Sequence, residues 1–153
     1  MNDAWSAVAI GLMLFAFMWL LVGALLAHAS GWPALAARYP GETRPEGGVL
    51  RGQVMGIGPI NENNVTYLIP TASGLYIYAM FLFRFLRPPI LIPWQEVVYE
   101  SSHKFLWVKF HKLRLAGGLS TLRVKDKGFR ELLPFLPNAS RALLRPGPSA
   151  TRS

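Results

Sequence analysis

The sequence predicts a membrane-anchored, mainly β protein: one N-terminal transmembrane helix, then a bent antiparallel sheet of about seven strands and a C-terminal helix. Three observations predict this fold class. The segment from Ala4 to Ala27 contains no charged residue. Short apolar runs separated by turn residues follow it, and an amphipathic run begins at Asp126. The expected divisions are an anchor (1–29), a juxtamembrane turn and linker (30–48), a domain (49–137) and a mostly disordered tail (138–153).

The apolar segment is long enough to cross a bilayer. At about 1.5 Å per residue it can pass through a hydrocarbon core of roughly 30 Å as one helix. Ala27-His28-Ala29 is similar to a signal-peptide cleavage site. However, no Lys or Arg precedes the apolar run, and the run exceeds the usual apolar region of a signal peptide. We therefore expect an uncleaved, single-pass anchor.

Positive charge gives the orientation. No Lys or Arg lies before the span, whereas Arg38 and Arg44 follow it. Because Lys and Arg favour the cytoplasmic side, we expect a plasma (inner) membrane protein with its N-terminus outside and its domain cytoplasmic. Trp5 and Trp32 flank the span, where amphipathic rings mark the two interfaces.

Small residues at four-residue spacing occur twice in the span. Ala7 with Gly11, and Gly23 with Ala27, would permit close approach of a second helix. Such residues are also common in spans that do not pair. Homo-oligomerisation through the anchor is therefore one open possibility.

Proline and glycine divide the chain after the span. Ser30-Gly31-Trp32-Pro33 is expected to break the helix, and Ala34 to Tyr39 to form a short helical turn at the membrane surface. Pro40 to Gly48 has the composition of a linker. Gly47-Gly48 marks the expected start of the domain.

The domain is predicted to consist of short strands joined by turns. Asn61 to Asn64, Thr71 to Gly74 and Ala116 to Gly118 are expected to be turns. The predicted strands are Val49–Ile57, Val65–Ile69, Leu75–Phe85, Ile90–Trp94, Val97–Ser101, Phe105–His111 with an extension toward Leu115, and Leu119–Val124.

A helix is predicted to begin at Asp126, whose carboxylate can accept hydrogen bonds from unpaired N–H groups. Pro134 should limit or kink this helix, and Pro137 should end it. Its apolar face consists of Phe129, Leu132, Leu133 and Leu136, at the spacing of a helix.

Two short phrases carry a resemblance to a known family. Thr71, Gly74, Leu75 and Tyr76 form the first, and Ile92, Pro93, Trp94, Glu96 and Val97 form the second. With this element order, the chain from Val49 to Leu136 resembles the pleckstrin-homology-like (PH-like) superfold, in particular its GRAM and bacterial PH branches. It also resembles small bacterial membrane proteins that join one N-terminal span to such a domain. The resemblance implies a binding or scaffolding module, often for lipid headgroups or peptides.

Residues for catalysis or metal binding do not form a recognisable set. The chain has no cysteine. His103 and His111 share strand parity, but eight residues of extended chain separate them by roughly 26 Å, so they cannot share a metal unless the chain bends. We expect both histidines at the surface. The sequence therefore predicts no enzyme, no cofactor and no metal site.

Basic residues are concentrated in the last third of a chain whose formal net charge is +8. Each Lys or Arg near an anionic leaflet contributes about 1 kcal/mol to binding. A solvated basic surface is the alternative interpretation. The candidate headgroup-binding residues are Lys104, Lys109, Lys112, Arg114, Arg123 and Lys125.

Residues 80–89 form a second candidate surface because apolar side chains occupy both strand parities. Aromatic rings beside arginines suit insertion into the membrane interface. Packing into the core is the alternative. The candidate insertion residues are Phe81, Phe83, Arg84, Phe85 and Arg87.

Three functions fit these observations. The first is an anchored, non-catalytic binding or scaffold module whose basic face contacts anionic lipid. The second is an assembly subunit that recruits a membrane-protein partner or a second copy. The third is nucleic-acid binding, for which Trp107 beside Lys104 and Lys109 is compatible with base stacking. The anchor makes nucleic acid the least favoured partner.

Overall fold

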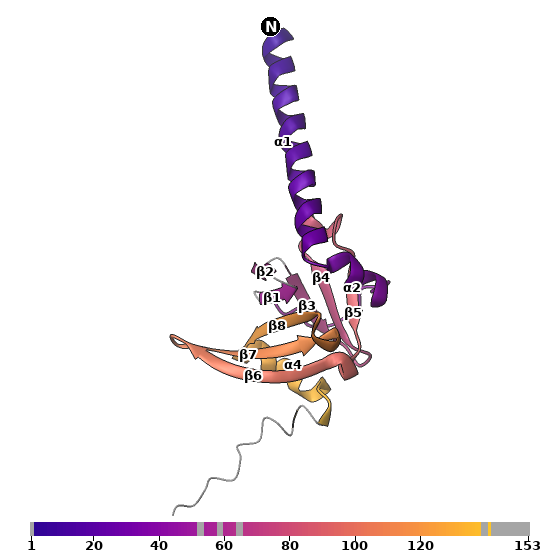
Figure 1. The fold of residues 1–153 in the computed structure, drawn as a ribbon, viewed down its shortest axis with the longest axis vertical. Coiled ribbons are helices and arrows are strands. Elements are labelled where there is room, and N and C mark those ends of the chain that lie inside the picture. Colours follow the sequence, from indigo (N-terminus) through magenta and orange to yellow (C-terminus); the bar gives the residue numbers. More distant parts are fainter. Residues whose placement is uncertain (1, 52–53, 58–59, 64–65, 139–140, 142–153) are drawn as a thin grey trace, which may run out of the picture.

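The computed structural model describes residues 2–51, 54–57, 60–63, 66–138 and 141. An apolar helix, α1 (Asn2–Ala29), extends along the long axis away from a mainly β domain, and a C-terminal helix, α4 (Asp126–Leu132), lies at the opposite end (Figure 1). The predicted succession of apolar helix, antiparallel strands and C-terminal helix is therefore confirmed. Most of the predicted tail, 142–153, falls outside the described residues.

Within the described residues, α1 is the one helix that is long and apolar enough to cross a membrane. Its 28 residues correspond to about 42 Å, more than the roughly 30 Å of a hydrocarbon core. Its side chains are exposed except near the C-terminal end, where Gly23 and Ala27 are buried. Gly31, with φ of 76°, separates α1 from α2 (Trp32–Arg38), as the predicted helix break requires.

The described strands form two antiparallel sheets. The five-stranded sheet has the order β2-β1-β8-β7-β6, and the three-stranded sheet has the order β3-β4-β5. In sequence, the strands are β1 (Val54–Ile57), β2 (Ile60–Asn63), β3 (Thr66–Pro70), β4 (Leu75–Ala79), β5 (Ile90–Ile92), β6 (Val97–Phe105), β7 (Val108–Leu115) and β8 (Ser120–Lys125).

The core contains residues from both sheets and from both ends of the domain. Ile77 of β4, Leu113 of β7 and Phe129 of α4 belong to one buried cluster. Trp32 of α2 belongs to the same cluster and has no exposed surface, so the expectation of an interfacial ring at Trp32 is wrong. Its indole Nε1 donates a hydrogen bond to the Pro88 carbonyl at 2.9 Å, which ties α2 to the β4–β5 connection.

Two predicted local structures are wrong in this part of the chain. Ile60–Asn63 is a strand paired with β1, where the sequence suggested a turn from Asn61. The predicted strand Leu75–Phe85 ends at Ala79, and a short helix, α3 (Phe81–Arg84), follows. After Ala79 the backbone N–H groups of Phe83 and Arg84 donate hydrogen bonds to the Met80 carbonyl, so this segment satisfies its hydrogen bonds within a helical turn.

The predicted strand Phe105–His111 is also wrong, because it contains the tip of a hairpin. Phe105 pairs with Val108, and the two residues between them reverse the chain; Leu106 has φ of 53°. The predicted turn at Ala116 to Gly118 is confirmed: a 3₁₀ turn (Ala116–Gly118) connects β7 to β8.

The C-terminal helix follows the prediction in most respects. It begins at Asp126, and a 3₁₀ turn (Leu133–Phe135) that contains Pro134 follows it. Phe129, Leu132 and Leu136 are buried in the core, and Leu133 is half-buried. The residue before the helix, Lys125, makes no side-chain capping hydrogen bond, and the Asp126 carboxylate contacts His111 of β7 and Arg130 of α4.

Candidate membrane-facing site

The connection between β4 and β5 packs against the anchor. The Phe83 ring stacks on Trp19 of α1, with 5.8 Å between ring centroids. A Cβ atom on Gly23 would lie 2.8 Å from Leu86 Cδ1, so the glycine allows this close approach. Leu82 lines a shallow apolar hollow together with Phe15 and Trp19. The loop that carries α3 therefore lies beside the second half of α1 (Figure 1).

The side of the β4–β5 loop that faces away from α1 has exposed apolar side chains. Phe81 and Phe85 are 85% and 84% exposed, and Leu82 is 60% exposed. Burial of one such ring against an apolar phase is favourable by about 1.5–3 kcal/mol. The arrangement thus differs from both core packing and a free surface loop, because one side contacts α1 and the other side is exposed.

The five candidate insertion residues have different positions. Phe81, Phe85 and Arg84 are exposed, while Phe83 is half-buried against α1. Arg87 is only 5% exposed, and its guanidinium lies over the rings of Trp32 and Phe83 at 5.8 and 5.7 Å. Arg87 is therefore placed as a packing residue that connects α2 to α3, contrary to its expected interfacial role.

The candidate headgroup residues do not form one surface. On β7, His111, Leu113 and Leu115 are buried, so the alternate residues Lys112 and Arg114 are on the face away from the core. Cross-strand pairing places Arg123 opposite Lys112 and Lys125 opposite Phe110, on that same outer face. Lys104 and Lys109 pair with each other near the hairpin tip. The alternation of side chains along the strands places both lysines on the other face of the sheet, opposite to Lys112 and Arg114.

One member of the outer group also has an acidic neighbour. Lys112 Nζ lies 3.2 Å from the Glu100 carboxylate, and both side chains are partly exposed. In Figure 1 the strands of this sheet cross the long axis of the molecule below the C-terminal end of α1. The six residues are thus spread over the two faces of this sheet.

The tip of the β6–β7 hairpin exposes a second apolar group. Phe105, Leu106, Trp107 and Val108 are all exposed, with Trp107 at 88%. The tip points sideways from the domain (Figure 1). Lys104 and Lys109 flank it, so the tip combines apolar side chains with positive charge.

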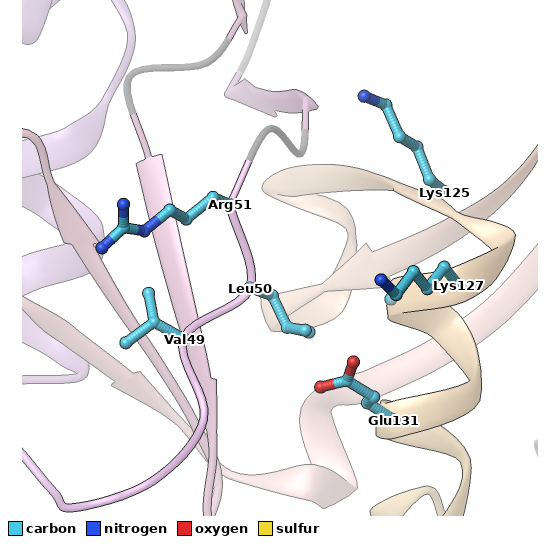
Figure 2. A pocket seen from close by; sticks show the side chains of 7 residues that line it. Val49, Leu50, Arg51, Lys125, Lys127 and Glu131 are labelled. Atoms are coloured by element: carbon cyan, nitrogen blue, oxygen red, sulfur yellow. The ribbon is translucent and has the colours of Figure 1, made fainter.

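A basic cavity of about 240 Å³ lies between the segment before β1 and the start of α4. Figure 2 shows that its charges do not converge: the Arg51 guanidinium points away from Lys127, and Lys125 points away from both. Glu131 also lines this cavity. The cavity therefore offers no focused anion site.

Of the two histidines expected at the surface, only His103 lies there. His103 is exposed, as expected, but His111 is only 4% exposed. His111 Nε2 lies 2.9 Å from Asp126 Oδ1, and its ring stacks on Phe129 with centroids 3.9 Å apart. The hydrogen bond with His111, followed by that with Arg130, lowers the pKa of the Asp126 carboxyl. The hydrogen bond and the ring stacking of His111 thus connect β7 to α4.

The hairpin also changes the relation between the two histidines. Ser102, not His103, pairs with His111, and His103 pairs with Phe110. His103 and His111 therefore lie on opposite faces of the sheet and do not form a common site.

Sequence reasoning missed an arginine cluster next to α3. Arg44, Arg51 and Arg84 line one pocket with Tyr67 and Tyr78. These residues come from four separate parts of the chain, so no local pattern marks them. The one signal in the sequence is Arg84 within the predicted insertion segment.

Comparison with known proteins returns no match: no family model, no curated protein and no solved structure is similar to this chain. The PH-like resemblance therefore stays a prediction.

Proposed function

We propose that the chain is a non-catalytic binding or scaffold module, anchored in the plasma (inner) membrane by α1, with a PH-like domain at the cytoplasmic surface. One observation carries the proposal: the exposed rings of Phe81 and Phe85 project from a loop that packs on the apolar anchor. An apolar helix and an adjacent apolar loop favour the same lipid phase. The anchor and α3 together would fix the domain against the bilayer.

The length of α1 supports this position of the membrane. From Ala4 to Gly23 the helix covers about 30 Å, which matches a hydrocarbon core. Trp19 lies four residues before Gly23, where this hydrocarbon core would end. The contact between Trp19 and Phe83 is therefore about 6 Å inside the core, measured along the axis of α1. Interfacial elements bury their apolar faces by about 5–10 Å. The predicted depth of α3 is therefore that of an interfacial element.

Contacts between the two family-like phrases support the PH-like part of the proposal. Trp94 Nε1 donates a hydrogen bond to the Thr71 carbonyl at 2.7 Å. Thr71 Oγ1 donates to the Gly74 carbonyl at 2.7 Å, and a Cβ on Gly74 would lie 2.5 Å from the Ile92 carbonyl oxygen. The phrases are thus adjacent across β4 and β5, as residues that specify one local fold should be.

Single cysteines test the anchor and its orientation, because the native chain has none. We would express Asn2→Cys and Glu131→Cys variants in bacterial cells and label them with a membrane-impermeant maleimide. The proposal predicts labelling of Asn2→Cys in intact cells, because residue 2 precedes the apolar span, labelling of Glu131→Cys only after lysis, and retention of both in the membrane at alkaline pH. Extraction at alkaline pH, or the reverse labelling pattern, would contradict it.

The hairpin tip favours a second candidate function, recruitment of a partner protein. Its exposed Trp107, between Leu106 and Val108, has the character of an interface hot spot. A photo-crosslinking residue in place of Trp107 would give one discrete adduct in membranes if a partner docks there. Adducts with lipid alone would argue against recruitment.

A further inference from the structure

The arginine cluster lies in a pocket of about 290 Å³ formed by β3, β4, the start of α3 and the segment before β1. Arg44 lies over the Tyr78 ring at 5.0 Å, and Arg51 lies over the Tyr67 ring at 5.7 Å. The two tyrosine rings contact each other, with centroids 5.2 Å apart. Stacking on paired rings restricts the guanidinium groups of both arginines.

The pocket is strongly positive. Arg84 brings a third guanidinium from α3, and none of the described residues that line the pocket is acidic. Neither Arg44 nor Arg84 makes an ion pair with a described carboxylate. Their field reaches the neighbouring strand residue Tyr76: burial raises the pKa of its phenol, and Arg84 and Arg44 oppose that rise. The like charges of Arg44 and Arg84 repel one another across the pocket that both residues line, so a bound anion would stabilise the pocket.

Arginine geometry narrows the chemical class of this anion. Guanidinium groups donate paired, parallel hydrogen bonds that match the oxygens of a phosphate, and such charge-assisted bonds are short and strong. The pocket is at the small end of ligand sites, which span about 300–1,000 Å³. It therefore fits a phosphate-bearing headgroup better than an entire lipid.

The location of the pocket indicates the source of the phosphate. Met80, Phe81 and Arg84 line it and belong to α3 or to the residue before it, the element that packs on the anchor through Phe83. Phe81 thus borders both the pocket and the apolar surface. A phospholipid could therefore place its acyl chain against the apolar surface at Phe81 and its phosphate in the pocket beside Arg84.

We propose that Arg44, Arg51 and Arg84 form a binding site for the phosphate of an anionic phospholipid headgroup. This proposal rests on the proposed membrane-anchored function. The proposed site differs from the headgroup-binding residues predicted from the sequence on β6, β7 and β8, and it lies next to the loop that packs on α1. Tyr67 and Tyr78 act as the platform for the arginines.

Native mass spectrometry of the full chain tests the site. The chain would be released from nanodiscs containing equal amounts of phosphatidylglycerol and phosphatidylcholine. We expect the wild-type chain to retain phosphatidylglycerol selectively. Arg44→Gln/Arg84→Gln should lower the ratio of retained phosphatidylglycerol to phosphatidylcholine at least tenfold, about 1.4 kcal/mol. The matched control, Arg114→Gln/Arg123→Gln, removes the same charge from the outer face of the five-stranded sheet and should keep the wild-type ratio.

Several results would overturn the inference. Equal losses in the test and control variants would show general electrostatic attraction instead of a site. No selectivity in a wild-type chain that stays in the nanodisc would remove the site while leaving the membrane-anchored function intact. Failure of the wild-type chain to incorporate would instead contradict the anchored function itself.

Two further arms complete the test. If the double variant unfolds by circular dichroism, Arg84→Glu at an exposed position of α3 replaces it, with the same expected loss. Inorganic phosphate is the probe for a soluble source. Retention of phosphatidylglycerol in 1 mM inorganic phosphate supports a lipid site, and its complete displacement would overturn the lipid assignment.

Discussion

Trp32 and Trp107 show at the residue scale how position determines the role of one side-chain type. Trp32 is fully buried, belongs to the core cluster and donates a hydrogen bond to Pro88. Trp107 is 88% exposed at the hairpin tip. Trp32 therefore joins the anchor to the domain, whereas Trp107 is free to contact something outside the fold.

These positions predict opposite effects on stability. Trp32→Ala should lower the free energy of unfolding by about 3–5 kcal/mol, because it leaves a large cavity in the core. Trp107→Ala should change it by less than about 0.5 kcal/mol, as at other exposed sites. Chemical denaturation of the two variants in a mild detergent, followed by circular dichroism, measures both values. Equal stability of the two variants would show that Trp32 is not a core residue.

Asp126 predicts a dependence of stability on pH. Its hydrogen bonds with His111 and Arg130 lower the pKa of its carboxyl in the folded chain. The stabilisation is therefore fully present above the unfolded pKa, about 4, and is lost as pH falls through the lowered folded pKa. Asp126→Asn should unfold at a lower temperature than wild type at pH 7, and this difference should shrink toward pH 3.

Thermal unfolding at several pH values measures this prediction, with Glu131→Gln on the same helix as the control. A difference between Asp126→Asn and wild type that stays constant from pH 7 to pH 3 would exclude the ionised carboxylate as its cause.

At the residue scale, burial patterns were predictable only where one face of a strand or helix is uniformly apolar. Phe129 and Leu132 were assigned to the core because their spacing fits a helix. His111 was not, since its burial depends on a partner, Asp126, in another element. The convergence of Arg44, Arg51 and Arg84 depends on the same kind of long-range packing.

At the element scale, small residues near the C-terminal end of α1 allow the loop that carries α3 to pack closely against it. The Gly23–Ala27 pair, expected to permit contact with a second helix, is buried within the chain, and Leu86 approaches Gly23. Ala7 and Gly11 remain on the exposed part of α1. The close contact that the small residues suggested is therefore made, at Gly23, with Leu86, which follows α3 in the same chain.

This contact predicts the effect of a bulky residue in the anchor. Gly23→Leu should displace Leu86 and loosen the 80–88 loop, since even a Cβ atom at position 23 comes within 2.8 Å of Leu86. Gly11→Leu is the matched control, because nothing lies within 4 Å of a Cβ there. Hydrogen exchange of the Arg84 and Leu86 amides should accelerate at least tenfold in Gly23→Leu alone.

Equal exchange rates in both variants would mean that the α1–α3 contact does not stabilise the loop. The contact itself was outside the reach of sequence reasoning, because Leu75–Phe85 has the composition of one strand. The contact of Phe83 with Trp19 joins α3 to a distant part of the chain, so the segment itself does not reveal it.

At the scale of the whole molecule, the anchor, α2 and the domain form a continuous structure. α2 contributes Trp32 and Leu35 to the domain core, and Pro40 forms a β-bridge with Ile90. The composition of residues 30–48 predicted a turn and a linker, but composition does not report these long-range contacts. The apolar span and the antiparallel class were predictable, since both follow from local hydrophobic patterns.

The proposed function requires that α3 enters the membrane interface beside α1. The most direct measurement uses an environment-sensitive fluorophore on Phe85→Cys, with Glu131→Cys on α4 as the control, in the full chain reconstituted into liposomes. Lipid-attached quenchers at known depths then report the position of each probe.

If α3 lies in the interface, the probe at position 85 should show a blue-shifted emission and stronger quenching by shallow than by deep quenchers. The probe at position 131 should show an aqueous spectrum without quenching. An aqueous, unquenched probe at position 85 would contradict the claim.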